Sequence, residues 1–203
     1  MVLKNMSINI IDLSKKYGRR EIIEGLTYKF ENSTHYLIFG DNGIGKSTLF
    51  KSIMRQVKYL GICDVDGRIS YCPEDPQFPA FMSVGLFIKT FATLTEDIED
   101  IDERIQQMLK RYGIEGFEKK VLGSLSKGQK MKINIIQSLL KPSEILLMDE
   151  PLSGLDEESK KVLIEDLRND KRMIIVISHE ITPFDNEKFK KVKFDGKRIE
   201  EVL

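Results

Sequence analysis

The stretch "GDNGIGKST" at residues 40–48 constrains the fold of this chain more than any other, because its pattern is typical of a loop that wraps an anion. It directly follows the apolar run "HYLIF" and precedes the helix-like "LFKSIM", which gives the order strand, loop and helix. Glycines let such a loop turn tightly with its N–H groups inward, and the next helix points its positive end at the anion. The residues of the loop are Gly40, Asp41, Asn42, Gly43, Ile44, Gly45, Lys46, Ser47 and Thr48.

This loop predicts a phosphate-binding site. Lys46 can reach the β- and γ-phosphates of a nucleotide, the Ser47 hydroxyl can ligate Mg²⁺, and Thr48 adds a further donor. The alternative is a glycine-rich turn without a ligand, but the complete motif in its strand–loop–helix context argues against it.

Composition and charge narrow the class of protein. The 203 residues suffice for one domain, or for a domain with a subdomain, around a sizeable core. The 32 basic and 32 acidic side chains balance, which argues against a wholly basic surface for nucleic acid. The sequence contains no run of about 18 or more apolar residues that could span a membrane. The N-terminal stretch "MVLKNMSINI" lacks the long apolar segment of a signal peptide. Cys63 and Cys72 lack CxxC spacing, so we expect two reduced core thiols in a cytoplasmic protein.

Apolar runs predict an α/β fold with a mainly parallel sheet. The runs "HYLIF" (35–39), "EILLMD" (144–149) and "RMIIVIS" (172–178) are continuously apolar, as are short strands buried on both faces. The runs "SINIIDL" (7–13) and "LTYKF" (26–30) mix apolar and polar positions and therefore predict an antiparallel part. Near the C-terminus, Asp195-Gly196 lies between two strand-like pieces and predicts a hairpin.

The middle of the chain has helical periodicity instead. Residues 83–121 are acidic and carry one apolar stripe at helical spacing. The members of this stripe are Ile101, Ile105, Met108, Leu109 and Tyr112. A further helix is predicted from Lys127 to Leu140, because the ring of Pro142 disfavours helix at the preceding residue.

These patterns together predict a single domain over residues 1–203 with a P-loop NTPase core. The α/β core and its antiparallel β subdomain are expected in residues 1–75 and 141–203. A helical subdomain is expected as an insert at about residues 76–140.

Three polar side chains follow the predicted parallel strands. Asp149 and Glu150 end one buried strand, and His179 ends another in "VISHE" (176–180). In an open parallel sheet, ligands bind beyond the carboxyl ends of the strands, so all three are expected near the phosphates. Asp149 suits the Mg²⁺ shell, Glu150 can polarise an attacking water, and His179 can reach the γ-phosphate or the water. A solvated turn for the two acids and a structural role for the histidine are the alternatives.

Five motifs in order resemble the nucleotide-binding subunit of an ABC transporter. They are "GDNGIGKST", "LSKGQ" (125–129), "ILLMDEP" (145–151), "SGLD" (153–156) and "ISHE" (177–180). The likeness covers nearly the whole chain. It implies an ATP-binding α/β core with a smaller helical subdomain, and a reaction in which MgATP is hydrolysed to ADP and phosphate.

The resemblance also implies two further contacts with the nucleotide. Tyr17 resembles the aromatic residue that stacks on adenine, although a partly buried tyrosine at a strand end is the alternative. Glu74, in "YCPEDPQFP" (71–79), occupies the place of the usual Q-loop glutamine. A carboxylate can ligate Mg²⁺ but cannot donate a hydrogen bond while ionised, so Glu74 is expected to act through the metal or its water.

In the family, the "LSKGQ" motif faces the γ-phosphate of an ATP held by the opposite subunit. Ser126 suits the N-cap of the next helix, with its hydroxyl available to phosphate, and Gly128 allows close backbone approach. Gln129 completes the motif. Lys127 replaces the usual glycine and either points to solvent, which we prefer, or adds charge near the phosphate. Asp156 resembles the acid that contacts the opposite subunit.

The partners implied are therefore a second ATP-binding subunit, identical or different, and integral membrane permease subunits. They would hold the chain as a peripheral protein on the inner face of the cell membrane, and no nucleic-acid partner is expected. Phe78, Phe81 and Met82 are candidates for the permease contact, with packing inside the helical insert as the alternative. The alternative function is a soluble ATPase of the same superfamily that drives assembly of a cofactor or protein complex.

Overall fold

The computed structural model describes residues 6–32, 34–94, 96, 98–185 and 188–202. The first five residues, on which the expectation about the N-terminus partly depends, lie outside the described residues. Within the described part of the chain, no helix is both long enough and apolar enough to cross a membrane.

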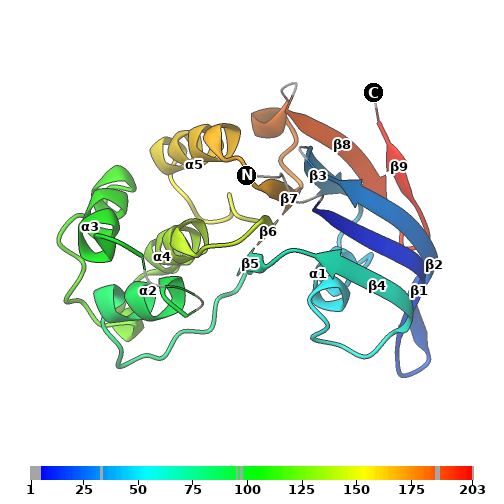
Figure 1. The fold of residues 1–203 in the computed structure, drawn as a ribbon, viewed down its shortest axis with the longest axis horizontal. Helices are drawn as coiled ribbons and strands as arrows, with labels where there is room; N and C mark the ends of the chain where they lie inside the picture. Colours follow the sequence, from blue (N-terminus) through cyan, green and yellow to red (C-terminus); the bar gives the residue numbers. More distant parts are fainter. Residues whose placement is uncertain (1–5, 33, 95, 97, 186–187, 203) are drawn as a thin grey trace.

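A six-stranded sheet runs through the centre of the molecule (Figure 1). Its order is β5 (Ile69–Cys72), β6 (Ile145–Asp149), β7 (Met173–Ile177), β3 (His35–Phe39), β8 (Phe189–Phe194) and β9 (Ile199–Glu201). All neighbours are parallel except β8 and β9, which form the predicted hairpin at Asp195-Gly196. The three predicted core strands β3, β6 and β7 are therefore confirmed as neighbouring parallel strands.

A second, antiparallel sheet has the order β2 (Arg20–Glu31), β1 (Ser7–Tyr17) and β4 (Leu60–Asp66). The antiparallel pairing predicted for the first two strands is confirmed, and both strands extend beyond the predicted runs. The sequence pattern does not predict β4 or β5. Leu60 and Ile62 of β4 are apolar yet exposed, so the apolar residues in its sequence do not mark the face that is buried, and β5 has only four residues.

The α-helices in the described part of the chain are α1 (Lys46–Ile53), α2 (Val84–Ala92), α3 (Ile101–Arg111), α4 (Lys127–Leu140) and α5 (Glu157–Asn169). The bounds of α4 agree with the prediction. The predicted apolar stripe of α3 is buried, apart from Met108, which is partly buried against the same cluster. In Figure 1, α2, α3 and α4 gather at one end of the molecule and the antiparallel sheet lies at the other.

Alternate residues of the central strands fill two separate apolar layers. Leu146 and Met148 of β6 face a cluster built with α2, α3, α4 and α5, whereas Ile145 and Leu147 face one built with α1 and the antiparallel sheet. Both cysteines are buried free thiols, Cys72 in the first cluster and Cys63 in the second. The sheet is thus covered on both faces, which explains why its strands are continuously apolar.

The burial of β6 predicts a large difference between two identical substitutions. Leu147→Ala should lower the free energy of unfolding by about 2–5 kcal/mol, because it leaves a cavity between the sheet and α1. Leu60→Ala, at a side chain that is 73% exposed, should change it by less than ~0.5 kcal/mol. Urea denaturation of both variants measures the contrast, and equal losses would contradict the assigned core.

Candidate functional site

The phosphate-binding loop joins β3 to α1. Gly45 is the N-cap of α1 with φ 116°, a backbone conformation that favours glycine, and a Cβ there would lie 2.6 Å from Ile22 Cγ2. Lys46 is buried, and its ammonium group donates hydrogen bonds to the carbonyl oxygens of Gly40 (2.8 Å) and Asp41 (3.0 Å). The loop therefore folds over the side chain of Lys46, at the positive, N-terminal end of α1.

Asp149 at the end of β6 is buried, and its Oδ1 atom has no hydrogen-bond partner among the described residues. Burial raises the pKa of this carboxyl above its ordinary value, although a hydrogen bond with the Ser47 side chain opposes the shift. The charges of Glu74 and Glu150 raise it further. A buried carboxylate oxygen without a partner is costly, so the site fits a cation that would satisfy it.

The site suits a cation that takes only some of its ligands from protein side chains. Within the described residues, no three His, Cys, Asp or Glu side chains are grouped so as to hold a metal ion. Mg²⁺ commonly takes one or two carboxylates together with water and phosphate oxygens. Asp149, the Ser47 hydroxyl and the exposed carboxylate of Glu74 are the oxygen donors that the chain offers on this side of the site.

Glu150 and His179 form a direct pair. His179 Nδ1 lies 2.8 Å from Glu150 Oε2, and the His179 backbone N–H donates to the same oxygen at 3.3 Å. Glu150 has φ 48°, an uncommon conformation for a residue other than glycine, and its N–H donates to the Ile177 carbonyl at 2.8 Å. The carboxylate is thus held at the end of the sheet, where it can accept a proton from a water molecule.

One cavity of about 460 Å³ joins these groups. The predicted residues that line it are Asn42, Gly43, Gly45, Lys46, Ser47, Thr48, Glu74, Asp149, Glu150 and His179. Ile22 and Ser153 also line the cavity, and sequence reasoning missed both. Ser153 lies in the "SGLD" motif, which could have marked it, whereas Ile22 has no local signal because only the approach of β2 to Gly45 of the phosphate loop brings it there.

The other predicted residues do not line this cavity. Tyr17 lies at the end of β1, about half exposed, and the Lys15 ammonium group lies 4.4 Å from the centre of its ring. Gly40, Asp41 and Ile44 support the loop through their backbone, since Ile44 N–H donates to the Asp41 carbonyl. The role of Tyr17 toward adenine stays a prediction.

Ser126 caps α4 as predicted. Its Oγ accepts a hydrogen bond from the Gln129 backbone N–H at 3.3 Å, and the Gln129 side chain accepts one from the Ser126 N–H at 3.0 Å. The Ser126 hydroxyl accepts in this cap, so its own proton can still be donated to another group. Lys127 is exposed, which agrees with the preferred solvent orientation.

The "LSKGQ" loop packs against the segment that follows Glu150. A Cβ on Gly128 would lie 2.6 Å from the Gly154 carbonyl oxygen, so close packing within this chain also requires glycine there. Asp156 caps α5 through the Ser159 N–H (2.9 Å), and its other oxygen pairs with Lys132 of α4 (2.7 Å). The hydrogen bond from Lys132 holds the pKa of the Asp156 carboxyl below its ordinary value.

A P-loop, a buried acid at a neighbouring strand end and a held carboxylate beside them define a nucleotide-hydrolysing α/β protein. A family model described as ABC transporter matches residues 23–153. The chain belongs to the ABC transporter family.

Individual relatives agree with this membership. The chain is 29% identical to the energy-coupling factor transporter ATP-binding protein EcfA1 of Thermotoga maritima, over 91% of this chain and 77% of the relative. It is 28% identical to the manganese transport system ATP-binding protein MntB of Halalkalibacterium halodurans, over 88% and 78% of the two chains. A solved ATP-binding subunit of an ABC transporter superimposes with a TM-score of 0.85 at 21% identity, over 97% of this chain and 89% of that one.

These comparisons confirm the predicted α/β fold of an ABC ATPase. They also confirm the predicted class of function, an ATP-binding subunit whose ATP hydrolysis is coupled to transport. The residue roles, the metal, the second subunit and the permease contact are predictions that remain to be tested.

The unpartnered carboxylate oxygen of Asp149 predicts that its substitution stabilises the protein alone but weakens its stabilisation by MgATP. Asp149→Asn removes a charge that burial disfavours, so the protein alone should gain about 1 kcal/mol of unfolding free energy. The same variant should lose the extra stabilisation that ATP with Mg²⁺ gives to the unsubstituted protein. Thermal unfolding with and without MgATP measures both effects.

Asp64→Asn, at an exposed aspartate of β4, is the matched control and should change neither quantity. Full MgATP stabilisation in the Asp149→Asn protein would contradict the assignment of Asp149 to the cation.

Proposed function

We propose that two copies of this subunit, or this subunit and a related one, close around two MgATP molecules and drive separate membrane permease subunits. The observation that carries the proposal is the Glu150–His179 pair, because its 2.8 Å contact holds a carboxylate in the same cavity as Lys46, Ser47 and Asp149. A nucleotide-binding site without hydrolysis would not need a carboxylate fixed in this way.

In this proposal the phosphate loop and Lys46 bind the β- and γ-phosphates of ATP. Lys46 would exchange its bonds to the Gly40 and Asp41 carbonyls for bonds to phosphate oxygens, which keeps the buried ammonium group paired. Ser47, Asp149 and Glu74 are the residues that would hold Mg²⁺, whose charge would neutralise the phosphate oxygens when it is bound. The position of Glu74 on the wall of the same cavity supports this role.

Glu150 would act as the general base. Its carboxylate accepts the proton of the attacking water, and the contact with His179 fixes the direction in which it can do so. The exposed His179 ring can use its other nitrogen toward the γ-phosphate. Positioning and charge stabilisation would supply most of the rate enhancement, as is usual in phosphoryl transfer.

The proposed pairing of two subunits is supported by predicted phosphate-contact residues that do not line the cavity of their own chain. Ser126, Gly128 and Gln129 form a capped helix start outside the cavity of their own chain. Backbone N–H groups at such a helix start attract anions, and the Ser126 proton can be donated to one. A second subunit that brings its own phosphate loop opposite this helix start would supply that anion.

A groove of about 800 Å³ beside the helical segment is the proposed contact for the permease. Phe78 and Met82 line this groove and also pack against the buried core. The alternative given for them above, packing within the protein, therefore holds in part for these two residues. Phe81 differs from both because its side chain is 97% exposed. An apolar groove with an exposed aromatic residue beside it suits an amphipathic helix of a membrane partner, which would keep this chain peripheral to the membrane.

Substitution of the proposed base should separate binding from hydrolysis. Glu150→Gln should bind ATP with its usual affinity, lose on the order of 100-fold in turnover, and accumulate as an ATP-bound dimer. Phosphate release and sedimentation velocity with MgATP measure the two effects, and Glu158→Gln, at an exposed acid of α5, is the control. Wild-type turnover in the Glu150→Gln protein would contradict the role of the base, and a monomer with bound ATP would contradict the pairing.

The groove predicts a selective loss of partner binding. Phe81→Glu places a charge on the exposed ring position, so it should abolish co-purification with the permease from detergent-solubilised membranes without changing the melting temperature. Leu60→Glu, at an exposed leucine of β4, should keep the permease bound. Co-purification of the permease with both variants alike would count against the groove.

A further inference from the structure

A lysine outside the cavity is bound to the residue next to His179. Lys160, on the first turn of α5, places its ammonium nitrogen 3.1 Å from each carboxylate oxygen of Glu180. The side chains of Lys160 and Glu180 are only 20% and 32% exposed, and Glu157 adds a weaker contact to the same lysine at 3.4 Å. The hydrogen bond that Lys160 donates to Glu180 is the largest cause of its raised pKa, so Lys160 carries its charge throughout the neutral range.

The short turn that carries His179 is fixed at its other end by the sheet. Ser178 is fully buried, and its N–H donates to the Ile38 carbonyl of β3 at 3.2 Å. Its hydroxyl accepts a hydrogen bond from the Glu180 N–H at 3.0 Å, which closes a local turn around His179. Ser178 therefore holds the turn from the core, and Lys160 holds it from α5.

His179 itself is poorly restrained by packing. Its side chain is 63% exposed, yet its Nδ1 must stay near 2.8 Å from Glu150 for the pair to exist. An exposed ring keeps such a distance only if its backbone is fixed, because buried neighbours do not limit its rotation. The two anchors at Ser178 and Glu180 lie on either side of His179 and supply that restraint.

The helix that supplies Lys160 is anchored in turn. Asp156, the N-cap of α5, pairs with Lys132 of α4 at 2.7 Å, and the Lys132 side chain is largely buried. The first turn of α5 is therefore tied both to α4, whose N-cap is Ser126, and to the turn of His179. A displacement of α4 or of the His179 turn would act on α5 through the Asp156–Lys132 and Lys160–Glu180 ion pairs.

We propose that Lys160 is a positioning residue for ATP hydrolysis: through Glu180 it sets His179 against Glu150. The inference rests on the catalytic roles given above to Glu150 and His179. It adds that the salt bridge between Lys160 and Glu180 acts on the rate of hydrolysis and leaves nucleotide affinity unchanged. Partly exposed ion pairs contribute little to stability, so its removal should leave the fold intact.

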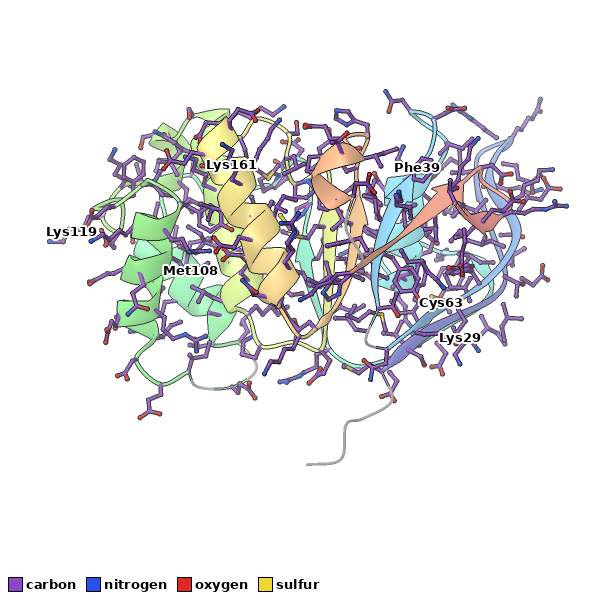
Figure 2. The ribbon with its side chains drawn as sticks, turned by 90° about the horizontal axis from the view of Figure 1, so that it is seen from above. Lys29, Phe39, Cys63, Met108, Lys119 and Lys161 are labelled. Atoms are coloured by element: carbon purple, nitrogen blue, oxygen red, sulfur yellow. The ribbon has the colours of Figure 1, made fainter. Side chains whose placement is uncertain are left out.

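The test compares Lys160→Met with Lys161→Met, the same change at the next, exposed residue of α5 (labelled in Figure 2). Single-turnover hydrolysis and the affinity for a fluorescent ATP analogue are measured for each. Lys160→Met should slow hydrolysis about 10- to 100-fold, as expected for a displaced catalytic group, at unchanged analogue affinity. Lys161→Met should equal the unsubstituted protein.

Two further measurements exclude a merely structural effect. In a His179→Ala background, Lys160→Met should cause no additional loss, because the residue through which it acts is already absent. Exchange of the two charges, Lys160→Glu with Glu180→Lys, should recover most of the rate lost in Lys160→Glu alone. Glu180→Gln, which keeps the size of the side chain, replaces Lys160→Met in the comparison if that variant fails to fold.

The inference is overturned if Lys160→Met hydrolyses ATP as fast as Lys161→Met, or if it slows hydrolysis equally with and without His179. Loss of analogue affinity in Lys160→Met would also overturn it. These results are distinct from failure of the proposed function, in which His179→Ala and Glu150→Gln would themselves retain wild-type turnover.

Discussion

The parallel pairing of β6 with β7 and of β7 with β3 is the interaction on which the site depends. In this register Asp149 pairs with Ile177, and Ile177 pairs with Ile38, so three strands end at one edge of the sheet. The phosphate loop, Glu150 and His179 follow these strand ends, and Asp149 is the last residue of β6. The N–H of Glu150 and the N–H of Ser178 then bond to neighbouring strands, which extends the order of the sheet into the first residues of the loops. The side chains of the site are held in place because the backbone that carries them is hydrogen-bonded to the buried strands.

The sequence predicted most of this arrangement because the chemistry is local. Lys46, Asp149 and Glu150 lie in motifs that directly follow buried apolar runs, and the rule about strand ends then places them together. Ile22 was missed because its place on the cavity wall depends on a contact between distant segments, whereas Ser153 was missed although the "SGLD" motif could have marked it. The unmarked strands β4 and β5 were missed for a related reason, since exposed apolar residues and a four-residue run carry no usable periodicity.

Single functional roles were harder to predict than membership of the site. Gly128 was expected to make room for phosphate, yet its position is also required by the approach of the Gly154 carbonyl oxygen. Asp156 was expected to serve an opposite subunit, yet both of its oxygens have partners within this chain. In each case, intrachain contacts bind the "LSKGQ" loop to the segment after Glu150. Within one subunit, the loop proposed for the partner's nucleotide is therefore in direct contact with the segment that follows the proposed base.

The proposed pairing of two subunits implies that one chain holds only part of the site. It is tested most directly by an experimental structure of the Glu150→Gln protein with ATP and Mg²⁺. We expect two subunits, with the ATP held by Lys46 of one subunit and its γ-phosphate in contact with Ser126 of the other. A single subunit that encloses ATP with its own residues, with Ser126 far from any phosphate, would contradict it.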